Sequence, residues 1–181
     1  MSSKDFRESI SIETISITGA IAAGFILASG LKLIDSIPSL LILIPGFLGI
    51  HGSISTSIAS RIAAGLFLGA IKPTFKPQRI LVGNAVAGVI LSLSLSLFLG
   101  IAAYSLEFLL SGKSSPQVIM ISLMASVISS PIMITTTIIF SIWFFRKHFD
   151  PNNIMGPYMT TLGDIIGIIV LILIAIGVVH P

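Results

Sequence analysis

The sequence contains no cysteine and few charged residues. Lys and Arg number 10 and Asp and Glu number 7, together 9% of 181 residues, whereas soluble domains carry about 25%. Without cysteine there is no disulfide framework, no thiolate zinc site and no thiol redox chemistry. The 3 histidines, His51, His148 and His180, are too scattered to form a poly-histidine site. These absences leave few residues for a soluble domain.

Long apolar runs make up most of the sequence. Hydrophobic residues account for 54% of the chain, and the mean hydropathy is +1.08. A membrane-spanning helix needs about 20 mostly apolar residues. We therefore expect an all-α, polytopic membrane protein with five transmembrane helices, forming a single integral-membrane domain over residues 1–181 without a soluble sensor domain. The predicted helices cover approximately residues 12–34, 38–70, 80–106, 116–145 and 157–179.

The second predicted span is too long for one straight crossing of the membrane. Residues 38–70 would form a helix of roughly 50 Å at 1.5 Å per residue. Pro45 and Gly46, together with Gly49 and Gly52, interrupt the apolar pattern. Two interpretations stay open: a broken helix that lines a cavity, or a helix kinked at proline with an extension beyond the membrane.

The basic residues predict the orientation of the chain. Of the 10 Lys and Arg residues, all except Lys32 and Lys113 precede the first span or fall around the second-to-third and fourth-to-fifth connections. Cytoplasmic loops carry an excess of Lys and Arg. The pattern therefore predicts an N-terminus inside and a C-terminus outside, in a multi-pass protein that we assign to the cell (plasma) membrane.

Asp164 lies within one of the most apolar stretches of the chain. A carboxylate at the centre of a membrane helix costs about 2.5–3.5 kcal/mol on insertion scales, so it usually has a function. Helical spacing places Thr161, Thr160 and Gly156 near the same face. These oxygen-bearing groups suit a hard cation, and Mg²⁺ needs only one or two carboxylates because it keeps most of its waters. Asp164, Thr160, Thr161 and Gly156 are therefore the candidate metal residues, with Mn²⁺ or Co²⁺ as alternative ions.

One carboxylate per chain is too little charge for a divalent ion. Two copies related by a two-fold axis would supply a formal charge of −2, which predicts a homodimer. Alternatively, Asp164 pairs with Arg61 or with a helix terminus, or is protonated. A proton- or sodium-coupled carrier that uses Asp164 as its titrating group, and a non-transporting accessory membrane subunit, are the competing functions.

The second predicted span carries the other concentration of small and polar residues. Over residues 45–61 glycines and hydroxyl side chains favour close helix packing and a wetted surface. Gly49, Gly52, Ser53 and His51 are the candidates for lining a pore or for packing. An enzyme is not expected, because no Ser/His/Asp grouping, paired Asp motif or H-E-x-x-H motif is present. The basic residues flank membrane spans, so nucleic acid is not an expected partner, whereas the lipid bilayer is.

Two segments resemble the MgtE magnesium-channel family. Residues 150–164, DPNNIMGPYMTTLGD, resemble its last helix, and are closer still to its solute-carrier relatives, whose pattern is D-P-D-N, a proline, and a small or hydroxyl stretch that ends in G-D. Residues 45–61, PGFLGIHGSISTSIASR, resemble the P-x-x-x-G-x-x-G-N and A-S-R motif in the second helix of the same relatives. The family's asparagine in that motif is Ser53 here.

The resemblance implies Mg²⁺ transport through a pore at a dimer axis. Because the solute-carrier relatives fuse two five-helix units in one chain, it also implies that this chain pairs with itself or with a paralogous five-helix subunit. Asp164 then matches the central ion site, and Thr160 and Gly156 match the positions that line the pore one and two turns before it. Bacterial channels of this family carry an asparagine where this chain has Gly156, and they carry large cytosolic magnesium-sensing domains. Gating by such a sensor is not expected for this chain.

Overall fold

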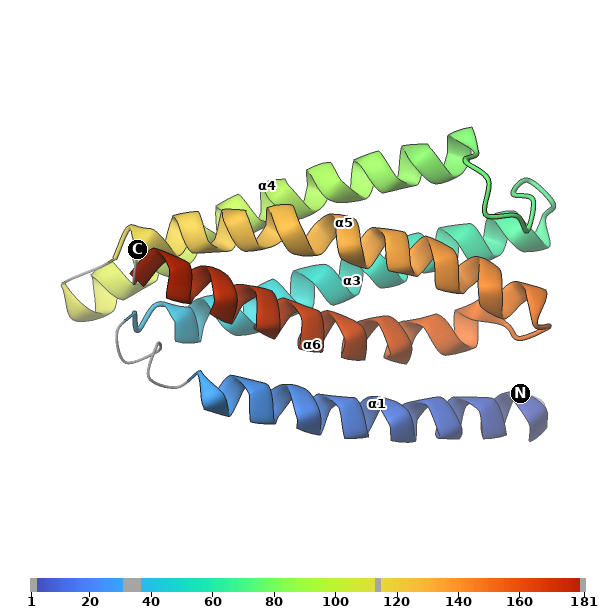
Figure 1. Ribbon diagram of the computed structural model, residues 1–181, viewed down its shortest axis with the longest axis horizontal. Coiled ribbons are helices and arrows are strands. Elements are labelled where there is room, and N and C mark those ends of the chain that lie inside the picture. Colours follow the sequence, from blue (N-terminus) through green and yellow to red (C-terminus); the bar gives the residue numbers. More distant parts are fainter. Residues whose placement is uncertain (1–2, 31–36, 113–114, 180–181) are drawn as a thin grey trace.

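The computed structural model describes residues 3–30, 37–112 and 115–179, and within them all regular structure is α-helical. The chain forms an elongated bundle in which the helices run along the long axis (Figure 1). The helices are α1 (Ser3–Ser29), α3 (Leu40–Phe67), α4 (Arg79–Ser111), α5 (Gln117–Arg146) and α6 (Pro151–Val179).

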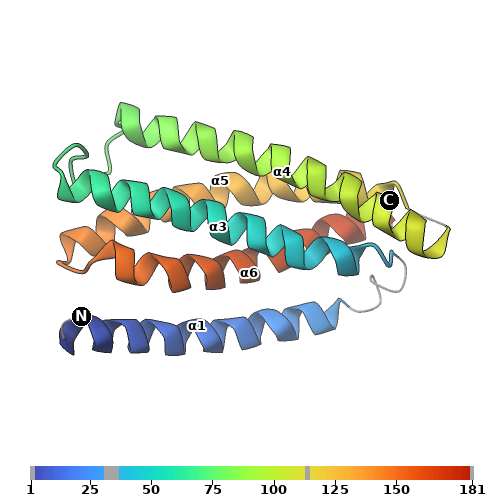
Figure 2. The ribbon, with the colours of Figure 1, turned by 180° about the vertical axis from the view of Figure 1, so that it is seen from behind.

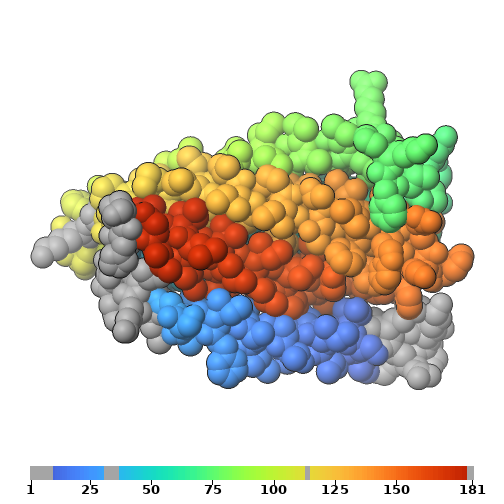
Figure 3. Space-filling model, viewed as in Figure 1, coloured from blue at the N-terminus to red at the C-terminus, as the bar shows by residue number. Residues whose placement is uncertain are grey.

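Each of these 5 helices is long and apolar enough to cross a membrane. The expected all-α fold with five membrane-spanning helices is therefore confirmed. α1 lies at one edge of the bundle, directly against α6, and α5 lies on the other side of α6 (Figure 3). Large side chains of α1 such as Phe25, which is 75% exposed, face outward as expected for contact with lipid.

α3 is one continuous helix, so the interpretation of the second span as a broken helix is wrong. Pro45 lies inside α3, close to its start. Pro45 has no N–H to donate to the carbonyl of Leu41, one turn before it, so the helix continues past one missing hydrogen bond. The helix ends at Phe67, where Gly69 adopts a φ of +70° and the N–H of Ile71 turns back to the carbonyl of Gly65 at 2.9 Å.

α6 begins at Pro151 rather than at Pro157, where the sequence pattern suggested its start. The Asp150 carboxylate accepts a hydrogen bond from the N–H of Asn152 at 2.9 Å. Asp before the first turn and proline as the first helical residue together form a strong start signal. Pro157 therefore lies within the helix. α4 extends to Ser111, beyond the predicted end at residue 106.

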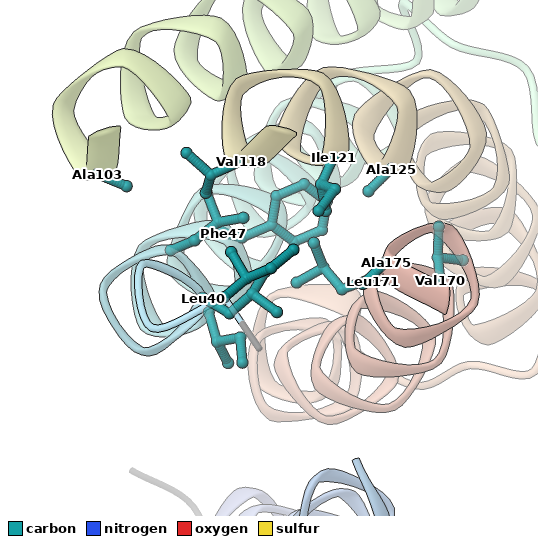
Figure 4. Packing of buried hydrophobic residues seen from close by; sticks show 12 residues of the cluster. Leu40, Phe47, Ala103, Val118, Ile121, Ala125, Val170, Leu171 and Ala175 are labelled. Atoms are coloured by element: carbon teal, nitrogen blue, oxygen red, sulfur yellow. The ribbon is translucent and has the colours of Figure 1, made fainter. Parts of the chain in front are cut away.

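The apolar core lies between α3, α5 and α6. Phe47 of α3 is fully buried, and Val118 and Ile121 of α5 and Leu171 of α6 pack around it (Figure 4). α5 packs against α3, α4 and α6, and α3 likewise packs against α4, α5 and α6.

α5 also buries a row of hydroxyl groups that we call the α5 hydroxyl seam. All of its members are 0% exposed: Ser122, Ser126, Ser129, Ser130, Thr137 and Ser141. The Ser122 hydroxyl donates to the Ser96 carbonyl of α4 at 2.7 Å, and Ser129 bonds to His51 of α3 at 2.8 Å. The seam therefore joins α5 to α4 and to α3 through neutral hydrogen bonds.

Basic side chains gather at one end of the bundle. The end of α3, the start of α4, the end of α5 and the start of α6 all lie there (Figure 1). Lys72 and Lys76 lie between α3 and α4, Arg79 begins α4, and Arg146 and Lys147 lie at the end of α5.

Candidate functional site

Gly156, Thr160 and Asp164 follow one another along one side of α6. They are separated by four residues, so each lies about 6 Å from the next along the helix axis. The Thr160 hydroxyl donates its proton to the carbonyl of Gly156 at 3.0 Å. The lone pairs of that hydroxyl remain free to accept, because Thr160 is exposed at the surface. Asp164 and Gly156 are both partly exposed.

The Asp164 carboxylate has no hydrogen-bond or ion-pair partner among the side chains that the structure describes, those of residues 10–30, 37–112 and 115–178. The proposed pairing with Arg61 is not formed. α3 and α6 run antiparallel, with Gly52 beside Thr160 and Thr56 beside Gly156. This register places Arg61 toward the start of α6 and away from Asp164.

α3 and α6 approach closely through small residues beside the stripe that Gly156, Thr160 and Asp164 form on α6. A methyl group added at Gly163 would lie 3.7 Å from the backbone nitrogen of Gly52 and 3.2 Å from the terminal methyl of Met133. One added at Gly52 would lie 3.8 Å from the Cα and the hydroxyl oxygen of Thr160. The close backbones fix Thr160 against α3 and keep the oxygen stripe at the edge of the interface.

The open side of α6 lies between α3 and α1 (Figure 2). On α6, Thr160 lies beside α3, whereas Thr161 lies beside α1. Asp164 follows these two threonines by about one helical turn, so its side chain projects between α3 and α1. On α3, Gly49 and Ser53 are exposed and lie next to the surface that contacts α6. We call the surface formed by Gly49, Ser53, Gly156, Thr160 and Asp164 the α3–α6 polar face.

Thr161 does not belong to this face. It is 9% exposed, and its hydroxyl lies 2.6 Å from that of Ser16 on α1 and 3.0 Å from the Pro157 carbonyl. A methyl group added at Gly19 of α1 would overlap the Thr161 methyl. Thr161 therefore joins α1 to α6.

His51 also points away from the α3–α6 polar face. It is 2% exposed, its Nε2 lies 2.8 Å from the Ser129 hydroxyl oxygen, and its Nδ1 lies 3.0 Å from the Phe47 carbonyl. Its ring packs against the Phe47 ring with the centroids 4.3 Å apart. In this structure His51 is an interior residue that connects α3 to α5.

Thr56 was not singled out from the sequence but borders the same interface. Its methyl group is the nearest contact to a methyl added at Gly156, at 4.0 Å, and its hydroxyl donates to the Gly52 carbonyl at 2.8 Å. The spacing in the sequence could have indicated Thr56, because it follows Gly52 by one helical turn and so lies on the same face of α3. It supplies a further hydroxyl beside the stripe.

The site has oxygen donors but little charge. Within the described part of the chain, no group of three or more His, Cys, Asp or Glu residues could hold a metal ion. Asp164 is the only acid on the α3–α6 polar face. A hydrated hard cation suits such a donor set better than a dehydrated ion does.

Comparison with known protein families matches residues 44–174 to MgtE, described as a divalent cation transporter. The chain belongs to the MgtE family. The match extends from within α3 to within α6 and so includes every residue of the α3–α6 polar face. MgtE is a transporter family and not an enzyme class, and membership supports divalent cation transport by a multi-pass membrane protein. A comparison with curated proteins gave no match.

Proposed function

We propose that this MgtE protein carries Mg²⁺ across the cell membrane along the α3–α6 polar face, with Asp164 as the central ion site. The observation that carries the proposal is the Asp164 carboxylate, partly exposed on a spanning helix and without a partner among the described residues. An unpaired carboxylate facing lipid would cost several kcal/mol. A path for hydrated cations on this face would keep the carboxylate out of contact with lipid, so this cost would not arise.

The functional unit in this proposal is a dimer, either of this chain or with a paralogous five-helix subunit. One Asp164 supplies a formal charge of −1, and a second copy doubles it. The open side of α6 between α1 and α3 is the surface on which a second carboxylate can face the first. The partner also covers the polar face from lipid, which satisfies groups that hydrocarbon cannot.

The oxygens of the stripe suit an ion that keeps its water. Asp164 attracts the hydrated cation and accepts hydrogen bonds from its waters. Thr160, whose own proton is held by the Gly156 carbonyl, presents lone pairs that accept from the same waters. Mg²⁺ dehydrates reluctantly and prefers this mode of binding, and Mn²⁺ or Co²⁺ would be admitted by the same donors.

The gathering of cations at one end supports an orientation with the N-terminus inside. Lys72, Lys76, Arg146 and Lys147 all lie at the end from which α1 starts (Figure 1). Such an excess is typical of the cytoplasmic side.

Flux into proteoliposomes that contain only this protein tests the proposal. Wild type should admit Mg²⁺ to a trapped indicator, and Asp164→Asn should lower the rate by about 100-fold, because loss of second-shell groups alone typically costs 10–100-fold in metal sites. Asp150→Asn is the matched control, since asparagine retains the helix cap. A series with Mn²⁺, Co²⁺ and Ca²⁺ ranks the ions.

Full Mg²⁺ flux in folded Asp164→Asn would contradict the role of this residue. Flux that follows pH or Na⁺ and ignores divalent ions would identify a coupled carrier instead. No flux from well-folded wild type would point to an accessory subunit.

A further inference from the structure

A groove on the outside of the bundle lies between the first turns of α4 and the last turns of α5. It has a volume of about 480 Å³. Val82 and Ala85 of α4 and Ile139 and Ile142 of α5 line it, and residues 75–77 of the α3–α4 loop close its end. Val82 is 50% and Ile139 is 45% exposed, so the groove opens onto the surface that faces lipid.

The loop that closes the groove is held in place at several points. The Gln78 side chain accepts from the N–H of Lys72 and donates to its carbonyl, both at 2.9 Å. Ile71, just before, is 1% exposed and packs into the core. The Phe75 ring lies under the Arg146 guanidinium, 5.4 Å from its carbon to the ring centroid. The mouth of the groove therefore has a defined shape.

Positive charge surrounds this mouth. Lys76 lines the groove, Arg79 begins α4 three residues later, and Arg146 lies over the Phe75 ring that forms part of the wall. No acidic residue is among the described residues that line the groove. The cations lie at the basic end of the bundle, where the membrane surface is expected.

We propose that the groove binds one anionic phospholipid from the leaflet at this end, with an acyl chain between α4 and α5 and the phosphate at Lys76. The apolar groove lies at membrane depth and can hold the acyl chain of the lipid, and the basic residues at its mouth can bind the phosphate. A helix from a second copy fits less well, because it would have to bury Lys76 and Arg79 without a described acidic partner in the groove.

Counting of retained lipids by native mass spectrometry tests this assignment. Purified wild type is titrated with phosphatidylglycerol or with phosphatidylcholine of identical chains. Wild type should retain one phosphatidylglycerol in preference to phosphatidylcholine. Lys76→Gln should weaken that binding about fivefold, the effect of one cation near an anionic surface, whereas Lys147→Gln, which removes a charge outside the groove, should leave it unchanged.

Substitutions that fill the groove test whether it holds the acyl chain, without changing the charge of the protein. Ala85→Trp should abolish retention of the lipid, and Val82→Trp, at a more exposed position, serves if the first variant does not fold. Ala87→Trp is the control, because Ala87 is exposed on α4 away from the groove. Equal retention of both lipids, or equal phosphatidylglycerol binding by the groove variants and their controls, would overturn the proposal.

Discussion

The polar groups of α5 and those of α6 lie on neighbouring membrane-spanning helices but are used differently. In the α5 hydroxyl seam every member is neutral and 0% exposed, and Ser122 and Ser129 bond directly to adjacent helices. On α6, Thr160 is exposed, and the Asp164 carboxyl group is partly exposed and without a partner in the described part of the chain. The seam is closed to solvent and mostly hydrogen-bonded, with the Ser141 hydroxyl as an unpartnered exception among the described residues. The polar groups of Thr160 and Asp164, in contrast, reach the surface of α6.

The largest effect is expected where the two regions meet. A methyl group added at Gly163 would meet both Gly52 of α3 and Met133 of α5. Gly163→Leu should separate these helices, cost about 1–3 kcal/mol or more through overpacking, and abolish Mg²⁺ flux. The matched control is Gly177→Leu, since an added methyl group there meets nothing within 4 Å. Thermal unfolding in detergent and proteoliposome flux measure both consequences, and an unchanged melting temperature for Gly163→Leu would contradict the packing account.

A smaller effect should distinguish the two adjacent threonines. Thr160→Val removes an exposed oxygen from the α3–α6 polar face and should lower Mg²⁺ flux about tenfold, within the range for supporting groups at metal sites. Thr161→Val removes the bond to Ser16 and should leave flux within about twofold while costing roughly 0.6–1.7 kcal/mol, the range for hydrogen bonds between membrane helices. Flux and melting temperature are measured on both variants. A greater loss of flux in Thr161→Val than in Thr160→Val would reverse the assignment.

The smallest effect on transport is expected in the α5 hydroxyl seam. Ser129→Ala removes the hydrogen-bond partner of His51 Nε2 and should cost about 1–3 kcal/mol, because a buried polar atom is left unsatisfied. Flux per folded protein should stay at the wild-type level, since the seam is closed to the ion. A loss of flux in protein that melts normally would instead make His51 and Ser129 part of the transport path.

The sequence predicts only part of this difference between the polar groups of α5 and those of α6. The five spans follow from apolar length, and Asp164 stands out because a charge in such a stretch is costly. Thr160 and Thr161 could not be separated, since both lie one turn before Asp164 and only the position of α1 decides which is buried. His51 posed the same difficulty, because a glycine-rich helix presents small residues on several sides and its neighbours set which side is interior.

The prolines show the same dependence on context. The pattern shows Pro45 as an interruption of the second predicted span and Pro157 as the start of the fifth, yet both lie inside continuous helices. For α6 a local signal was present in Asp150 and Pro151, which cap and begin the helix. For α3 no comparable local signal is present, and its contacts with α4, α5 and α6 support the helix on both sides of Pro45.

The absence of cysteine permits the most direct test of the central claim, that Asp164 is an accessible charge on the ion path. Asp164→Cys should lose Mg²⁺ flux, and a sulfonate-bearing thiol reagent should restore a measurable part of it by returning a negative charge, whereas a trimethylammonium reagent should not. Ser129→Cys, in the buried seam, should react with neither. Full flux in unmodified Asp164→Cys, or modification of it no faster than that of Ser129→Cys, would contradict the account.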